Sequence, residues 1–266
     1  MPSSDEPLSH NPFWKEVFGG DRREMRRGRH FFRLLSRGDV PRCHYCLAPF
    51  AGFGAPIARA VGRGPWRRSH SLCNQCETVL RTQPGGTEVE MAMLFADVRG
   101  STPMAAGMSP VEYGTLMHRF YRAATKVFME NDAVIDKMVG DEVIGLFSVG
   151  VSGDDYVRRA ALAGQEMLRA TGHGEPGGPW LSIGVGVNAG VVFAGSLVAE
   201  SGAYEMVALG DPMNFASRLV GAAQGGELVM SEAVWSQVAG EIPAQPRTLT
   251  LKGYDRPVTA HVARVD

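Results

Sequence analysis

The chain has 266 residues, 44% of them hydrophobic and 21% charged, with a net charge of −1 at pH 7. This composition excludes disordered and collagen-like proteins and predicts one large domain with a small additional module. Residues 1–86 carry 14 Lys/Arg against 7 Asp/Glu, whereas residues 87–266 carry 13 against 21. The uneven distribution of charge indicates two units with different roles.

Residues 1–40 form a basic segment, and within it residues 12–37 are predicted to be helical in pieces, with a break at Gly19-Gly20. The first ten residues are polar and acidic without a following apolar stretch, so we expect no signal peptide and a cytoplasmic protein. Seven arginines lie between positions 22 and 37. They favour a solvated basic helix packed on the rest of the protein, and a surface for nucleic acid or anionic lipid is the alternative.

Residues 41–81 contain all four cysteines, as Cys43-x2-Cys46 and Cys73-x2-Cys76. Two such pairs are typical of a tetrahedral zinc site with four thiolate ligands, and an iron–sulfur cluster is the alternative. His44 and His70 lie close by in sequence and are interpreted as bystanders. A unit this small has little core, so metal binding would contribute to its folding. We expect the module to regulate the larger domain or, as an equally favoured alternative, to form a rigid cap without a signalling role; binding of nucleic acid is the less favoured interpretation.

Residues 82–88 (TQPGGTE) have the composition of a linker, and a second domain is expected over 89–266. Ser109-Pro110 is typical of a helix start, with serine as the cap and proline in the first turn. Strands are predicted over 91–98, over 133–147 as a pair around Gly140-Asp141, and over 181–187, 191–197, 227–230, 248–251 and 258–265; helices are predicted over 109–130, 154–170, 212–222 and 231–238. The order strand-helix-strand-strand-helix-strand predicts an α+β fold of ferredoxin-like type.

Residues 180–199 contain no charge and are about long enough to span a bilayer. Four glycines and a turn-like Asn188-Ala189-Gly190 argue against a membrane helix. We predict two short strands joined by a turn instead, and no transmembrane segment.

Two aspartates lie where an apolar strand meets glycine, in FADVRGST (95–102) and in KMVGDEV (137–143). If Asp97 and Asp141 lie side by side, their carboxylates repel and favour a divalent cation such as Mg²⁺. Two such metals could activate an attacking oxygen and hold the leaving one. The turn Gly100-Ser101-Thr102 offers backbone N–H groups for phosphate oxygens.

A third segment, GDPMNFASR (210–218), begins a helix with Asn214 and Arg218 on one face. The segments FADVRGST, KMVGDEVIGLF and LGDPMNFASRL, in this order and spacing, resemble the class III nucleotidyl cyclase catalytic domain. The resemblance covers about residues 87–266. It implies an adenylate or guanylate cyclase fold preceded here by a small helical, zinc-ribbon-like module.

By similarity, Asp97, Asp141 and the backbone carbonyl of Val98 would bind two Mg²⁺ or Mn²⁺ ions. Asn214 would orient the ribose and Arg218 would stabilise charge on the α-phosphate. Lys137 would read the base, and Lys252 in LKGY would reach the triphosphate. The resemblance further implies a homodimer, because the family's site forms between two catalytic domains.

Val207 departs from the pattern, since adenylate-forming members usually carry a polar residue at this position. A valine cannot accept a hydrogen bond from the adenine amino group, so base selectivity is expected to be looser. We expect an adenylate cyclase acting on ATP, with GTP or a pyrimidine nucleotide as the alternative substrate. A nucleotide-binding regulatory protein without turnover, acting through the basic zinc module, is the second alternative.

Overall fold

The computed structural model describes residues 10–36, 40–67, 69–199 and 201–265. These residues form two compact units. The first comprises the described residues up to Glu90 together with Ser148–Asp154 and Val191–Leu209, and the second comprises Met91–Phe147, Asp155–Gly190 and the described residues from Gly210 onward. The predicted basic segment 1–40 therefore lies partly outside the described residues.

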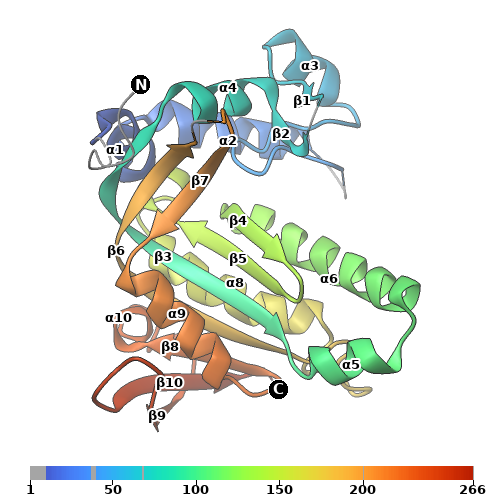
Figure 1. The fold of residues 1–266 in the computed structure, drawn as a ribbon, viewed down its shortest axis with the longest axis vertical. Helices are drawn as coiled ribbons and strands as arrows, with labels where there is room; N and C mark the ends of the chain where they lie inside the picture. The colour runs from blue at the N-terminus through green and yellow to red at the C-terminus, as the bar shows by residue number, and fades with distance from the viewer. Residues whose placement is uncertain (1–9, 37–39, 68, 200, 266) are drawn as a thin grey trace. The chain divides into compact units, whose positions relative to one another are not determined.

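The first unit is mainly helical, with a small two-stranded sheet (Figure 1). The predicted helical segment is confirmed as two helices, which Gly20 separates with a φ of 94° that suits glycine. The elements are α1 (Pro12–Gly19), α2 (Arg23–Leu35), α3 (Ala55–Ala60), β1 (Pro65–Trp66), β2 (Ser69–Cys73), α4 (Asn74–Thr82), α7 (Val149–Ser152) and β7 (Tyr204–Leu209).

The predicted linker 82–88 is only partly a linker, because β3 (Gly85–Val98) begins within it. A Cβ on Gly195 would lie 2.2 Å from the carbonyl oxygen of Gly85. The glycines of TQPGGTE therefore allow two strands to approach closely. In the sequence alone, the same glycines are typical of a flexible linker.

The second unit contains a sheet in the order β4-β5-β3-β6-β8-β10-β9 (Figure 1). Its first four strands have the ferredoxin-like order, so the predicted fold class is confirmed. Helices α6 and α8 pack on each other and on β5. The elements are α5 (Ser101–Gly107), α6 (Pro110–Glu130), β4 (Val134–Val139), β5 (Glu142–Phe147), α8 (Tyr156–Ala170), β6 (Ile183–Val198), α9 (Asp211–Ala222), β8 (Glu227–Ser231), α10 (Glu232–Trp235), β9 (Gln245–Leu249) and β10 (Val258–Arg264).

The predicted start of α6 is confirmed, with Ser109 as the N-cap and Pro110 in the first turn. The Ser109 hydroxyl accepts from the Glu112 N–H at 3.3 Å, and the Glu112 carboxylate accepts from the Ser109 N–H at 2.9 Å. This reciprocal capping box satisfies two N–H groups that a helix start otherwise leaves unpaired.

The prediction of two strands around 188–190 is wrong, because β6 runs without a turn from Ile183 to Val198. The Asn188 side chain donates to the Pro212 carbonyl oxygen at 3.0 Å and forms no turn of its own. A Cβ on Gly186 would lie 2.4 Å from the Val220 nitrogen, so this glycine allows α9 to approach the sheet. The glycines read as turn signals are packing positions.

Other boundaries also differ from the predictions. Helix α10 ends at Trp235, earlier than the expected position 238, and β9 begins at Gln245 where 248 was expected. No element was expected over residues 204–209. They form β7, which pairs antiparallel with the C-terminal part of β6.

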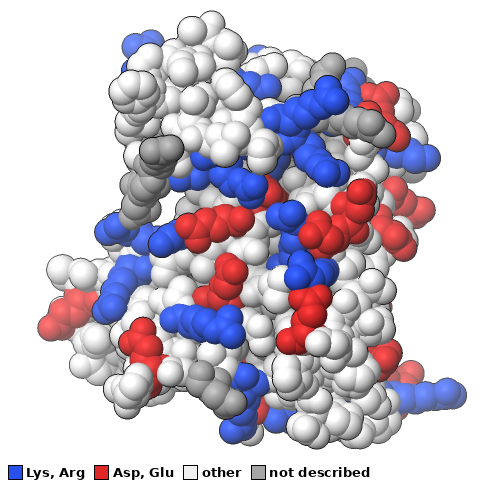
Figure 2. Space-filling view, turned by 180° about the vertical axis from the view of Figure 1, so that it is seen from behind, with Lys and Arg blue, Asp and Glu red and all other residues white. Residues whose placement is uncertain are grey.

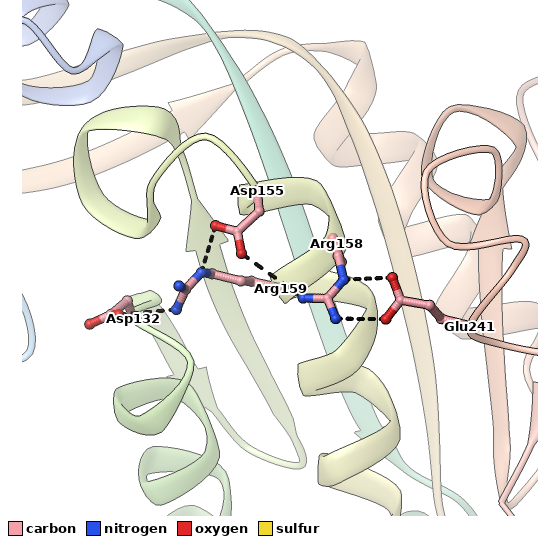
Figure 3. A network of polar contacts seen from close by, with 5 residues as sticks. All are labelled: Asp132, Asp155, Arg158, Arg159 and Glu241. Carbon is pink, nitrogen blue, oxygen red and sulfur yellow. Dashed lines mark hydrogen bonds and ion pairs between the residues drawn. The ribbon is translucent and has the colours of Figure 1, made fainter.

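Ion pairs tie the start of α8 to its neighbours within the second unit (Figure 3). Arg158 makes two 2.6 Å contacts with Glu241, and Arg159 contacts Asp155 at 2.8 Å and Asp132 at 3.3 Å. Exposed pairs of this kind each contribute little to stability, about 0–1 kcal/mol.

None of the helices in the described residues is both long and apolar enough to span a bilayer.

Candidate active site

Asp97 and Asp141 are brought together at one edge of the sheet by the antiparallel pairing of β3 with β5. Asp97 lies opposite Glu142 in the register, and the Val98 N–H donates to the Asp141 carbonyl oxygen at 3.1 Å. The Asp141 carboxylate is close enough to Asp97 to raise its pKa. The sequence analysis expected these two carboxylates to be adjacent, and the structure places them so.

The two aspartates lie in a half-buried site where negative charge is disfavoured. Burial raises the pKa of Asp97, the Arg99 guanidinium opposes that rise, and the Asp141 carboxylate adds to it. Burial also raises the pKa of Glu142, and the charges of Asp97 and Asp141 raise it further. Three carboxyl groups that share one sheet edge favour a bound cation.

Arg99 holds this edge in place, and the sequence analysis assigned it no role. Its guanidinium pairs with the Asp97 carboxylate and also donates to the carbonyl oxygens of Val220 and Ala223, at 3.3 and 3.2 Å. These carbonyls belong to the C-terminal end of α9, where a cation is favoured. The signal was present in FADVRGST, but only the tertiary structure shows what the arginine contacts.

The donor set fits a hard divalent cation. Asp97 and Asp141 offer adjacent carboxylate oxygens, which Mg²⁺ and Mn²⁺ prefer as ligands. Arg99 already supplies one positive charge to Asp97, which agrees with a site that needs charge compensation.

The turn after β3 leads into α5. Gly100 has a φ of 69°, a left-handed conformation that glycine adopts without strain, and Ser101 and Thr102 begin the helix. Lys137 lies on β4, half-buried, opposite Ile144 of β5. The predicted roles of these four residues in substrate binding stay predictions.

Asn214 and Arg218 are both exposed on α9, one turn apart, as predicted. Among the described residues, no hydrogen bond or ion pair joins either of them to Asp97 or Asp141 of the same chain. Asn214 lies nine residues before Ala223, which corresponds to about 13 Å along the helix. Asn214 thus lies toward the start of α9, whereas Arg218 lies only two residues before Val220, near the end of the helix that Arg99 contacts.

Lys252 lies in the exposed turn between β9 and β10. Tyr254, two residues later, donates its hydroxyl to the Asp211 carboxylate at 2.8 Å and packs edge-on against Phe215. Burial and the Asp211 charge raise the pKa of Tyr254 to about 12. The loop that carries Lys252 is thereby tied to the start of α9, a connection that the sequence analysis missed.

Val207 lies on β7, in the first unit, opposite Gly195 of β6. Its side chain is buried in the single chain.

The four cysteines converge on one point in the first unit. Their Sγ atoms all lie within 4.8 Å of one another, and the Cys46 and Cys73 Sγ atoms are 3.6 Å apart. Tetrahedral zinc with Zn–S bonds of about 2.3 Å needs Sγ separations of about 3.8 Å. His44 is not part of this group, and burial lowers its pKa to about 4. The His70 side chain lies outside the described residues.

The electrostatics of the cluster also fit a metal. Hydrogen bonds from the other three thiols hold the pKa of Cys46 well below its usual range. Burial acts to lower the pKa of Arg63, but the sulfur charges of Cys46 and its neighbours raise it overall. The backbone N–H groups of Cys73 and Cys76 also point at sulfur atoms, each at 3.4 Å. The lowered pKa of Cys46 fits a metal ligand. Burial, by contrast, raises the pKa of Cys43 well above its usual range, and hydrogen bonds with the other cysteines do the same for Cys76.

Over most of its length the chain is similar to known nucleotidyl cyclases. A family model described as the adenylate and guanylate cyclase catalytic domain matches residues 86–258. The chain belongs to this family. The cyclase domain therefore occupies most of the chain, as the resemblance implied, and the mixed α+β fold follows from it.

Individual relatives include both kinds of cyclase. An adenylate cyclase of Anabaena cylindrica is 31% identical over 152 residues, which are 54% of this chain and 30% of that protein. The adenylyl cyclase CyaB of P. aeruginosa (25% identity, 68% of this chain, 96% of that chain) and the guanylyl cyclase Cya2 (27%, 68%, 95%) both superpose with a TM-score of 0.60. An uncharacterized Mycobacterium tuberculosis protein is 27% identical over 67% of this chain and 33% of its own length. The chain spans about a third of the length of the curated relatives it matches.

Proposed function

We propose that the chain is a homodimeric adenylate cyclase that converts ATP to 3′,5′-cyclic AMP and pyrophosphate, with a structural zinc ion in its N-terminal module. The observation that carries the proposal is the adjacency of Asp97 and Asp141 at the paired ends of β3 and β5, in a chain that also presents Asn214 and Arg218 on α9. Membership of the cyclase family supports the reaction class.

Each residue has a role that its chemistry supports. Asp97 and Asp141, with the Val98 carbonyl, would hold two Mg²⁺ or Mn²⁺ ions, which when bound supply charge to the triphosphate and to the 3′-oxygen. Asn214 would orient the ribose so that its 3′-OH faces the α-phosphorus in line with the leaving pyrophosphate. Arg218 would stabilise the charge that develops on the α-phosphate. Lys252 and the turn at 100–102 would hold the remaining phosphate oxygens.

The geometry of α9 supports a site shared between two chains. Arg99 holds the C-terminal end of α9 beside Asp97, whereas Asn214 lies about 13 Å further along the helix. A nucleotide that contacts both the aspartates and Asn214 would therefore bind between two chains related by a twofold axis. Each of the two equivalent sites would take its aspartates from one chain and its Asn214 from the other.

Base selectivity rests on Lys137, whose ammonium would donate to adenine N1. Val207 offers no acceptor for the adenine amino group, which supports a looser preference than a polar residue would give. ATP is the proposed substrate because no carboxylate at position 137 is available to accept the hydrogen bonds that guanine donates.

The first experiment is product analysis with the purified full chain and each of the four nucleoside triphosphates, in Mn²⁺ and in Mg²⁺. We expect cyclic AMP from ATP, and loss of at least about a thousandfold in Asp97→Ala and in Asp141→Ala. Asp154→Ala, an exposed aspartate outside the site, is the matched control and should retain full activity. Absence of a cyclic product with all four nucleotides would refute the proposal in favour of a regulatory nucleotide-binding protein.

A complementation experiment tests the shared site. Asp97→Ala and Asn214→Ala are each expected to be inactive, but after mixing and subunit exchange their heterodimers contain one intact site. The mixture should then recover up to about a quarter of wild-type activity. A mixture that stays inactive while subunit exchange is demonstrated would show that each chain contains a complete site.

Val207→Asp tests the basis of base selectivity. The new carboxylate can accept from the adenine amino group, so the ratio of kcat/KM for ATP to that for GTP should rise by about tenfold. Val207→Leu, which keeps the position apolar, should leave the ratio unchanged. An unchanged ratio in Val207→Asp would remove Val207 as a determinant.

A further inference from the structure

The arginine-rich part of the first unit exposes large apolar side chains that nothing in the proposed cyclase reaction uses. Five of them are prominent, and Phe53 and Leu34 are 96% and 65% exposed. We name this set the apolar face; its members are Phe31, Leu34, Phe53, Ile57 and Val61. Exposed apolar patches of this kind mark surfaces that contact a partner or a membrane.

The members of the apolar face come from α2, from α3 and from the residues directly before and after α3. Phe31 and Leu34 lie three residues apart on α2, and Ile57 and Val61 lie four apart on and just after α3, so each pair points to one side. A Cβ on Gly54 would lie 3.0 Å from the Cβ of Leu35, which places the start of α3 against the end of α2. The end of α2 and the start of α3 are therefore neighbours, and Phe53 lies directly before that contact.

The segment of the chain that carries the apolar face is rich in positive charge. Residues 25–76 contain ten arginines, no lysine, no glutamate and one aspartate. In the described part of the chain, four exposed arginines from this stretch have no carboxylate partner: Arg26, Arg27, Arg59 and Arg67. Arg27 lies one helical turn before Phe31 on the same face of α2. In Figure 2 the region of α3 forms a mostly uncharged projection with Lys and Arg residues at its margins.

We propose that the apolar face, with its surrounding arginines, docks on an anionic lipid surface. An in-plane contact of this type combines apolar side chains that enter the interface with cations that remain among the headgroups. A second copy of the same surface would bring two strongly positive segments together, which disfavours self-association. Nucleic acid would satisfy the arginines but would leave Leu34, Ile57 and Val61 without a contact that requires them.

The test is co-sedimentation of the full chain with vesicles of phosphatidylcholine alone and of phosphatidylcholine with an equal part of phosphatidylglycerol. We expect binding to the anionic vesicles only, and weaker binding as salt is raised. Phe53→Ser should lower the partition coefficient about tenfold. The double variant Arg26→Gln with Arg27→Gln should lower it about thirtyfold. Val111→Ser, which removes a side chain that is 78% exposed on α6, is the matched control and should bind as wild type.

Each other outcome overturns the proposal. Equal binding to both kinds of vesicle, or to neither, removes the anionic surface as the partner. Tight binding to duplex DNA or RNA that Phe53→Ser does not change identifies nucleic acid instead. A change in oligomeric state in Phe53→Ser, measured by sedimentation without lipid, identifies a second copy. The result is independent of cyclic nucleotide synthesis, so it stands or falls separately from the proposed function.

Discussion

Residues 43–76 and the C-terminal stretch from Gly210 obtain their order from different interactions. In the first region four thiols converge on one point, and large apolar side chains such as Phe53 remain in solvent. In the second region the order comes from a buried apolar cluster, supplemented by one fully buried carboxylate, Glu227. The short segment buries only a few apolar side chains, such as Leu47, and its four thiols offer a metal site in addition, whereas the longer segment closes an apolar core of its own.

The largest expected effect concerns the thiol cluster. Cys73→Ser should abolish zinc binding, because a structural site with four ligands rarely tolerates the loss of one, and structural zinc contributes about 10 kcal/mol or more to folding. Elemental analysis should show zinc near one per chain in wild type and near zero in the variant, and limited proteolysis should cut within residues 41–81. Thr78→Ser on α4 is the control. A brown protein that contains iron would identify an iron–sulfur cluster in place of zinc. Full zinc occupancy in Cys73→Ser would show that Cys73 is not needed to hold the metal.

The next effect concerns Glu227 on β8. Its carboxylate accepts from Arg247 on β9 at 2.7 and 2.8 Å and from Arg264 on β10 at 2.8 Å, with its side chain fully buried. Glu227→Gln should therefore lower the free energy of unfolding by about 3 kcal/mol, because two arginines lose their counter-charge. Glu232→Gln, an exposed glutamate, is the control and should cost much less.

The lowered pKa of Glu227 predicts that the free energy of unfolding depends on pH. The Arg247 guanidinium, with smaller help from Arg264, lowers the pKa of Glu227 from 4.5 to about 2 despite its burial. A lowered pKa means that the stabilisation is complete above pH 4.5 and is lost as the pH falls from 4.5 toward 2. Acid unfolding curves of wild type and Glu227→Gln should converge over this range. Curves that stay parallel would show that Glu227 does not contribute the dependence.

A smaller effect is expected at Arg99. Arg99→Gln should lower the free energy of unfolding by about 2 kcal/mol, since Asp97 and the last carbonyls of α9 lose a charged donor. Arg99→Lys keeps the charge without the planar fork, so it should recover only part of the loss. Denaturant unfolding measures both. Equal stability of wild type and Arg99→Gln would mean that the end of α9 is held by other contacts.

The smallest effect concerns the capping box of α6. Ser109→Ala should cost about 1 kcal/mol, because the Glu112 N–H loses its acceptor at the helix start. Ser109→Asp keeps an acceptor at the cap and should restore most of the stability. Thermal unfolding measures the difference, and a neutral Ser109→Ala would show that water replaces the cap.

Local signals in the sequence predicted much of the second unit. Apolar periodicity and the Ser109-Pro110 start gave α6, and the Gly140-Asp141 turn gave the β4–β5 pair, because these features depend on neighbouring residues alone. The same reasoning failed at Gly186 and at Asn188, whose local appearance suggests a turn. Both residues contact α9: Gly186 lies against Val220, and Asn188 donates to Pro212. These partners lie far along the chain, so no local pattern reveals them.

The sequence by itself determined the family, the spacing of the cysteines and the identity of the carboxylates, since each of these is a fixed order of residue types along the chain. The tertiary structure decided which groups meet. It placed Arg99 between Asp97 and the end of α9, tied Tyr254 to Asp211, and left Phe53 and Leu34 in solvent. Such contacts join residues far apart in the chain, so their energies depend on packing that only the folded molecule defines.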